Sequence, residues 1–176
     1  MKPFFKTIVV LVPLSFLSGP LAADLAPQPQ VVFTQCSQGT FAADWQGVAG
    51  RTYLMQWSLD LMSWQYVPFI DFGDGMHSRG LASSSDKFFF RLHYGDFPEI
   101  TSLDEAMNAD FDSDGLTNIF EVTFGYDPFN ANSTADGADN ALDPEGDGMT
   151  NATENIRGLD PMRKDNPKVL LQVVAY

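Results

Sequence analysis

Short apolar runs alternate with polar turns in the first half of the chain, at a spacing of roughly 10 residues that is typical of antiparallel strands. Within Thr52–Ser58, strict alternation places Tyr53, Met55 and Trp57 on one face of a strand. The predicted strands are Val31–Phe33, Phe41–Trp45, Thr52–Ser58, Trp64–Phe69, His77–Leu81 and Phe88–Tyr94. Strands of this length and spacing predict a β-sandwich over residues 31–96.

Turn residues separate these runs. Gly47 and Gly50 mark one turn and residues 71–75 another, while Ser58 and Asp60 are expected to shape the turn between two strands. The segment from Val31 to Tyr94 also holds 13 of the 23 aromatic residues. A carbohydrate platform is one interpretation, but period-2 spacing favours core filling. The residues concerned are Trp45, Trp57, Trp64 and Tyr66.

The second half of the chain has a different pattern, with two short helical runs that each end at a glycine. Thr117–Phe124 precedes Gly125, and Thr150–Arg157 precedes Gly158, so each glycine is expected to end its helix in the left-handed conformation. Ser102 with Glu105 forms a capping box that predicts one more short helix. The expected apolar core is thin and consists of Leu116, Ile119, Phe120, Val122, Met149 and Ile156.

A twelve-residue acidic motif precedes each of the two helical runs. Asp110–Glu121 fits the pattern D-x-D-x-D-G-x5-E at every position. Asp143–Glu154 fits it again 33 residues later, with Glu145 at position 3. Across the 19 aligned positions beginning at Asp110 and Asp143, nine residues are identical. An internal duplication explains this similarity.

The spacing of the motif matches the coordination chemistry of calcium. Ca²⁺ takes about six to eight oxygen ligands, and a loop of about 12 residues supplies them from positions 1, 3, 5, 7, 9 and 12, with glycine at position 6. The predicted ligands are Asp110, Asp112, Asp114, the Leu116 carbonyl, Asn118 and Glu121, then Asp143, Glu145, Asp147, the Met149 carbonyl, Asn151 and Glu154. A donor set without His or Cys argues against zinc and copper. About two Ca²⁺ ions are therefore expected.

Both motifs resemble the bacterial thrombospondin type 3 and dockerin-like calcium repeats, which have EF-hand-type loops. Glu145 at position 3 and Pro144 at position 2 depart from that pattern. Thr117 and Thr150 stand where a sensor EF-hand has an aliphatic residue, so the resemblance implies static structural sites. Residues 136–139 are either a decayed third loop, with Asp136 and Asp139, or an outer-shell contribution.

A second resemblance concerns the predicted sandwich. The sequence from Trp45 to Trp64 follows W-x-G-x-x-G-x-T-Y and Q-x-S-x-D-L-x-x-W, and Lys87–Leu92 reads K-F-F-F-R-L. This pattern resembles a fibronectin type III or immunoglobulin-like module of exported bacterial proteins. The resemblance implies a mainly β sandwich followed by a small α-rich calcium-loop module at residues 97–161, and it carries no established activity.

The first residues of the chain suggest export, and the last ones suggest a further strand. Residues 1–23 combine Lys2 and Lys6 with an apolar run and a small-residue end, the pattern of a signal peptide, and the run is too short to span a membrane. Residues 24–30 are a linker rich in proline and glutamine. Residues 162–176 form a tail whose apolar end, Val169–Tyr176, predicts a strand that pairs either within the chain or with a neighbour. The expected location is extracellular, at the cell surface or in the periplasm.

The net charge of the chain limits the classes of partner and function that it can have. The formal net charge is -13, and fifteen acids but only one base lie between Glu99 and Asp160, which excludes a nucleic-acid partner. The sequence favours a secreted, non-enzymatic calcium-binding protein. The alternative is an adhesion or assembly module that docks a protein as dockerins do, or binds a glycan through the sandwich. Catalysis is disfavoured because the paired carboxylates belong to the loops and because His77 and His93 stand apart from any nucleophile.

Overall fold

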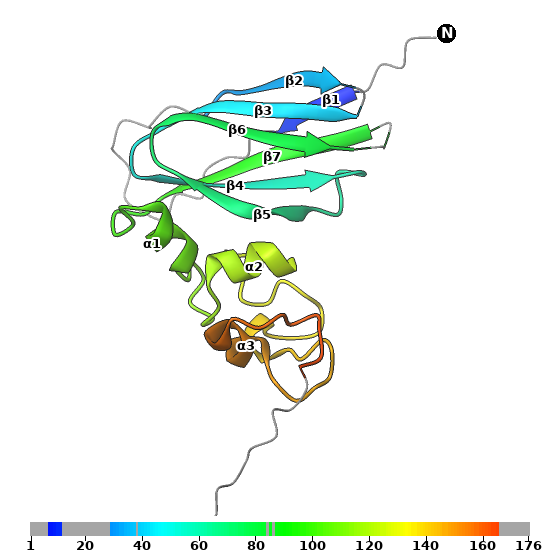
Figure 1. Cartoon of the computed structure of the whole chain (residues 1–176), viewed down its shortest axis with the longest axis vertical. Coiled ribbons are helices and arrows are strands. Elements are labelled where there is room, and N and C mark those ends of the chain that lie inside the picture. Colours follow the sequence, from blue (N-terminus) through cyan, green and yellow to red (C-terminus); the bar gives the residue numbers. More distant parts are fainter. Residues whose placement is uncertain (1–6, 12–28, 38, 84, 86, 166–176) are drawn as a thin grey trace, which may run out of the picture.

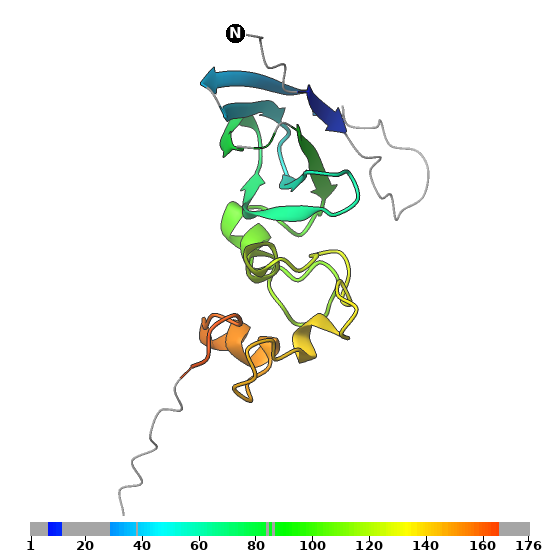
Figure 2. The same ribbon diagram turned by 90° about the vertical axis from the view of Figure 1, so that its right-hand side faces the viewer.

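The computed structural model of the protein describes residues 7–11 and 29–165, except residues 38, 84 and 86. The fold is mainly β, with two small sheets and three α-helices. Figures 1 and 2 show the sheets at one end of the molecule, with the helices following one another from the sheets toward the other end. In the described part of the chain, the helices are all too short or too polar to cross a membrane.

The strands form one three-stranded and one four-stranded sheet. The first has the order β2-β3-β6 and consists of β2 (Val31–Ser37), β3 (Thr40–Gly47) and β6 (Gly75–Ala82). The second has the order β1-β7-β4-β5 and consists of β1 (Thr7–Leu11), β7 (Lys87–Asp96), β4 (Arg51–Ser58) and β5 (Gln65–Phe72). All pairs are antiparallel except β1 with β7. Each of the six predicted strands is present.

Strand β1 is the element that the sequence did not predict. It pairs in parallel with β7, from Thr7 beside Lys87 to Leu11 beside Arg91, and it lies inside the predicted signal peptide. Its sequence holds four β-branched residues (Thr7, Ile8, Val9 and Val10), a composition that suits a strand as well as it suits the apolar run of a leader. The rest of residues 1–23 lies outside the described part, so the signal peptide remains a prediction.

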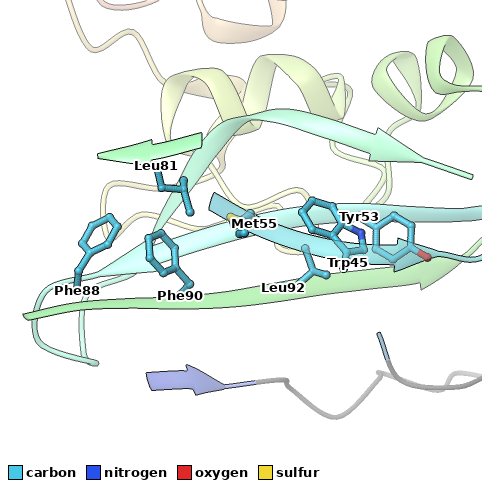
Figure 3. Close-up of a cluster of buried hydrophobic side chains, with 8 residues drawn as sticks. Trp45, Tyr53, Met55, Leu81, Phe88, Phe90 and Leu92 are labelled. Atoms are coloured by element: carbon cyan, nitrogen blue, oxygen red, sulfur yellow. The ribbon is translucent and has the colours of Figure 1, made fainter. Parts of the chain in front are cut away.

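The two sheets share one hydrophobic core. Figure 3 shows side chains of both sheets pointing toward one another. The three-stranded sheet contributes Ala43, Trp45 and Leu81, and the four-stranded sheet contributes Tyr53, Met55, Phe88, Phe90 and Leu92. The predicted inward face of β4 is therefore confirmed.

Core packing also accounts for most of the aromatic residues that might have bound sugar. Trp45 is 1% exposed and stacks on His77 with 5.2 Å between ring centroids. Tyr66 is buried as well, and the Trp64 ring lies against the guanidinium of Arg91. These contacts favour core filling, as the period-2 spacing predicted.

The turn between β4 and β5 has the predicted chemistry. The Ser58 hydroxyl accepts hydrogen bonds from the backbone N–H groups of Asp60 and Leu61. Asp60 Oδ1 accepts from the N–H groups of Met62 and Ser63, each at 2.8 Å. Both side chains thus replace backbone partners in a turn, as Ser and Asp commonly do.

The helices begin and end close to the predicted residues. They are α1 (Leu103–Asn108), α2 (Asn118–Phe124) and α3 (Asn151–Arg157), with a short 3₁₀ turn, η1 (Asp139–Ala141). Ser102 caps α1 by accepting from the Glu105 N–H, but the Glu105 carboxylate reaches one residue further back than expected, to Thr101. Gly125 and Gly158 end α2 and α3 with φ of 88° and 66°, the left-handed conformation that glycine tolerates.

A second core cluster joins the acidic half of the chain to the sheet. Leu54, Tyr66 and Ile70 of β4 and β5 pack with Ile100, Ala106 and Val122. The Tyr66 hydroxyl donates a hydrogen bond to Asp127 Oδ1 at 2.8 Å, and burial raises the pKa of Tyr66 above its ordinary value. The first acidic loop therefore sits on a scaffold that extends into the sheet.

The predicted core of the acidic half is only partly correct. Leu116 and Phe120 are buried and pack with Tyr126, whereas Ile156 is 84% exposed. The prediction for Ile156 was wrong because α3 turns Asn151 and Glu154 inward, and Ile156 then faces solvent. The predicted strand at residues 169–176 lies outside the described residues.

The shared scaffold leads to a prediction about pH. His93 of β7 contacts Gln56 Oε1 at 2.9 Å and lies close to Tyr66, Arg91 and Asp127. Burial, and then the charge of Arg91, lower the pKa of His93 from 6.5 to about 4, although Asp127 opposes the shift. The folded state thus prefers neutral His93, so this contribution to stability is full above pH 6.5 and is lost as pH falls toward 4.

We expect a His93→Gln variant to lack this dependence. Between pH 7 and pH 4.5 the wild-type free energy of unfolding should fall by about 2 kcal/mol more than that of the variant. Urea denaturation in identical buffers across this range measures the difference, and the carboxylates that the two proteins share cancel from it. A difference that stays constant with pH would contradict the assignment.

Candidate metal centre

The three aspartates of the first loop converge. Carboxylate oxygens of Asp110, Asp112 and Asp114 lie within 4.8 Å of one another. Backbone N–H groups fold the loop around them, because Asp110 accepts from Asp114 (3.1 Å) and Gly115 (2.8 Å). Gly115 has a φ of 95°, which explains why glycine occupies position 6 of the motif.

Glu121 brings a fourth carboxylate to this loop from helix α2. Its side chain is fully buried, and neither carboxylate oxygen has a hydrogen-bond partner among the described residues. Burial raises the pKa of Glu121 to about 9, with further contributions from Asp112, Asp114 and Asp110. Asp112 Oδ2 and Asp114 Oδ2 are likewise buried without partners. The loop thus encloses carboxylate oxygens that none of the described residues neutralises.

The second loop repeats the arrangement. Carboxylate oxygens of Asp143, Glu145 and Asp147 lie within 4.8 Å of one another. Asp143 accepts from the backbone N–H groups of Gly146 at 2.8 Å and of Gly148 at 2.9 Å. The chain therefore folds the two motifs of the duplication into similar acidic turns.

Glu154 of α3 takes the place that Glu121 holds in the first loop. It is fully buried, and in the described part of the chain both its oxygens and both oxygens of Glu145 lack hydrogen-bond partners. Burial, followed by the charges of Glu145, Asp147 and Asp165, raises the pKa of Glu154 to about 7. Two buried glutamates without partners, one in each loop, are the least expected feature of the acidic half, since buried charges normally have partners.

The two asparagines at position 9 make structural contacts. Asn118 Nδ2 donates to the Ala106 carbonyl at 2.9 Å, and Asn118 Oδ1 accepts from the Phe111 N–H at 3.1 Å. Asn151 Nδ2 donates in the same way to the Asp139 carbonyl at 2.7 Å. These amides fasten each loop to the segment before it, and their predicted part in metal binding stays a prediction.

The predicted backbone ligands lie between the aspartates and the helices. The Leu116 side chain is fully buried, which anchors the first loop next to the carbonyl at position 7. Met149 is partly buried at the same place in the second loop. Whether these carbonyls bind a metal also stays a prediction.

Polar contacts hold the two loops together. The Thr117 hydroxyl donates to Asn155 Oδ1 at 2.8 Å, and Asn155 Nδ2 donates to the Gly115 carbonyl at 3.3 Å. Asn140 Nδ2 donates to the Asp114 carbonyl. The turn at position 6 of the first loop is thus fixed by α3, which also carries Glu154.

The other acidic residues of this half have local roles. Asp139 is fully buried, and its carboxylate accepts from the Ser133 N–H and hydroxyl. Asp136 is exposed. Asp127 and Asp160 each accept a backbone N–H two residues ahead, as expected for turns that precede proline.

One residue near the second loop was missed by the sequence analysis. The Asp165 N–H donates to Asp147 Oδ2 at 2.9 Å, and Asp165 Oδ2 is buried without a partner among the described residues. Asp165 lies beyond the twelve-residue motif, so no spacing rule could have assigned it.

Comparisons with protein-family models, curated proteins and solved structures found no match to the chain. The chemistry of which the site is capable therefore has to be inferred from its own residues. The clustered side chains of each loop are oxygen donors, and the buried oxygens of Glu121 and Glu154 face no hydrogen-bond donor among the described residues. Such a donor set fits a hard divalent cation.

Proposed function

We propose that the protein is a secreted, non-enzymatic calcium-binding protein whose two acidic loops hold structural Ca²⁺. The observation that carries this proposal is the pair of buried, unpartnered glutamates, Glu121 and Glu154. A buried carboxylate without a partner costs several kcal/mol or shifts its pKa. A dication bound in each loop would remove the free-energy cost of burying these carboxylates.

Calcium fits this donor set better than other metals do. Each loop supplies four carboxylates, and the candidate backbone carbonyl at position 7 adds another oxygen. Such crowding suits the six to eight ligands of Ca²⁺, at about 2.3–2.6 Å, better than the tighter six-ligand shell of Mg²⁺. Zinc and copper prefer nitrogen or sulfur donors, which are not among the described residues of either cluster. When bound, the ion would supply charge neutralisation and cross-link the loop to its helix.

We infer that the two sheets form a fibronectin- or immunoglobulin-like β-sandwich, followed by a calcium-loop module similar to the thrombospondin type 3 and dockerin-like repeats. The shared core of β3, β6, β4 and β7 supports the sandwich. The repeated geometry of the two loops supports the module. In this arrangement the ions would stabilise the thin acidic half, and the sandwich would provide the larger hydrophobic core.

A structural role agrees with the positions of the two histidines. His77 stacks on Trp45 and contacts the Gly73 carbonyl at 3.1 Å, and His93 contacts Gln56. Both rings thus take part in packing the sheets. We therefore propose a binding protein rather than an enzyme.

Isothermal titration with Ca²⁺ tests the proposal. We expect about two sites in the wild type and none in Asp110→Ala/Asp143→Ala, because each substitution removes the first ligand of a loop. Asp74→Ala/Asp104→Ala is the matched control, since it removes the same charge from exposed positions. Extracellular calcium modules have Kd near 10⁻⁴–10⁻³ M, so an absence of binding at about 10 mM Ca²⁺ would refute the proposal.

An adhesion or assembly role is the second candidate. Ile156 on α3 is 84% exposed and Met162 is 52% exposed, so this end of the molecule offers apolar side chains to a partner. A pull-down from the native secretome with wild type and with Ile156→Asp compares the two functions. Recovery of no protein, or of the same proteins by both baits, would count against docking through Ile156.

Secretion has its own test. We propose that residues 1–23 are removed on export, so that the mature chain begins at Asp24. N-terminal sequencing of the protein from the culture medium or periplasm should find this terminus. Cleavage would also remove β1 and leave the β7 edge of its sheet unpaired. A mature chain that still begins near Met1 would refute the export signal.

A further inference from the structure

We propose that Asp165 is a ligand of the second calcium site, outside the twelve-residue motif. This inference rests on the proposed function and concerns the composition of one of its two sites. It makes the sites unequal, because the second would hold five carboxylates and the first would hold four.

The position of Asp165 supports this role. Its N–H donates to Asp147 Oδ2 at 2.9 Å, which fixes the residue against the carboxylate at position 5 of the loop. Asp165 Oδ2 is shielded from solvent and has no hydrogen-bond partner in the described part of the chain. Asp165 therefore leaves one shielded, unused carboxylate oxygen close to Asp147, which belongs to the cluster of the second loop.

The second, independent observation is Glu154. This side chain is fully buried, and both its oxygens are unpartnered among the described residues. Asp165 lies close enough to Glu154 for the charges of the two side chains to interact. An additional acid beside a buried and already repelled glutamate is unfavourable unless a cation lies between them.

A turn after α3 brings Asp165 back to the loop. Asp160 Oδ1 accepts from the Met162 N–H at 3.0 Å, and the Asp160 carbonyl accepts from the Arg163 N–H at 3.0 Å. The chain reverses there and returns past the loop. Asp165 thus reaches Asp147 over 18 residues of sequence.

The first loop has no counterpart of this ligand. The residue 33 positions before Asp165 is Asn132, which is exposed and whose N–H bonds to Asn130 Oδ1. The similarity of the two repeats therefore extends to Pro128 and Pro161, but it does not include the position of Asp165. The additional carboxylate should give the second site the higher affinity for Ca²⁺ and the stronger preference over Mg²⁺, because affinity rises with ligand charge and number.

Calcium titrations in two single-site backgrounds test the proposal. In Asp110→Ala, which keeps only the second site, adding Asp165→Asn should weaken Ca²⁺ binding roughly tenfold or more. In Asp143→Ala, which keeps only the first site, adding Asp165→Asn should leave the affinity unchanged. Asp136→Asn, an exposed acid of the same half, is the matched control for the lost charge.

The outcomes separate this inference from the proposed function. Unchanged affinity of Asp110→Ala/Asp165→Asn would overturn the role of Asp165 and leave the calcium sites intact. Equal weakening in both backgrounds would also overturn it, since Asp165 would then act through general charge or stability. An absence of calcium binding in the wild type would instead refute the proposed function. Circular dichroism of each variant confirms that the fold is retained.

Discussion

Chelation of calcium should lower the melting temperature of this protein by roughly 10 °C or more. The buried carboxylates of Glu121 and Glu154 repel the aspartates of their own loops, and only the folded chain holds these oxygens together. Binding to the folded state alone adds about 2.7 kcal/mol per site at 100 times Kd, so two sites add about 5 kcal/mol. Differential scanning calorimetry in about 10 mM Ca²⁺, roughly 100 times a Kd of 10⁻⁴ M at the tighter end of the range for extracellular modules, and then in excess chelator measures the shift.

Two controls test whether the shift in melting temperature arises from the loops. Asp110→Ala/Asp143→Ala should melt at the same temperature with and without calcium. Magnesium at the same concentration should give a smaller increase, because the loops crowd more oxygens than its six-ligand shell accepts. A wild-type melting temperature that does not respond to chelator would contradict the idea that calcium contributes to folding.

Local patterns in the sequence predicted the elements and the loops well. Apolar runs between turn residues predicted β3 and β7, and alternation predicted the inward face of β4, where Tyr53 and Met55 are buried. Glycine at the ends of α2 and α3 predicted the helix ends, because a left-handed φ excludes most other residues. The acidic motif predicted that the carboxylates cluster, because its twelve residues are enough to define the whole loop.

What sequence analysis missed depends on contacts between distant residues. Asp165 reaches Asp147 only because a turn at residues 160–163 reverses the chain. The hydrogen bond from Tyr66 to Asp127 joins residues 61 positions apart. Neither pair has a fixed spacing. Ile156 was assigned to the core because it is apolar, but the inward face of a seven-residue helix was already occupied by Asn151 and Glu154.

The asparagines at position 9 show a further limit of motif analysis. Asn118 and Asn151 offer oxygens at the spacing of calcium ligands, but their amides also satisfy buried backbone carbonyls of the preceding segment. A motif gives the position of a side chain along the loop, but it does not give the group with which that side chain forms a hydrogen bond. The sequence did hold one signal, since asparagine is identical in both repeats and has N–H donors that aspartate lacks.

Replacement of Glu121 by glutamine should change stability in opposite directions with and without calcium. In chelator, we expect Glu121→Gln to be more stable than the wild type by roughly 1–3 kcal/mol, because a buried carboxylate without partners is removed. The new amide also offers N–H donors near Asp112 Oδ2 and Asp114 Oδ2, which lack partners among the described residues. In calcium, the variant should be less stable if Glu121 is a ligand as we propose, because the bond that the ion would form between α2 and the loop is lost.

Urea denaturation of the wild type and of Glu121→Gln measures the expected gain of stability in chelator and the expected loss in calcium. The calcium concentration should be about 10 mM, well above the Kd range of extracellular modules. Glu99→Gln, which removes the same charge from an exposed position, should change stability little in either condition. A Glu121→Gln variant that is destabilised equally with and without calcium would indicate that the carboxylate only packs. The reversal of sign is specific to a ligand, because a glutamate that merely fills space has no reason to become unfavourable when the cation is withdrawn.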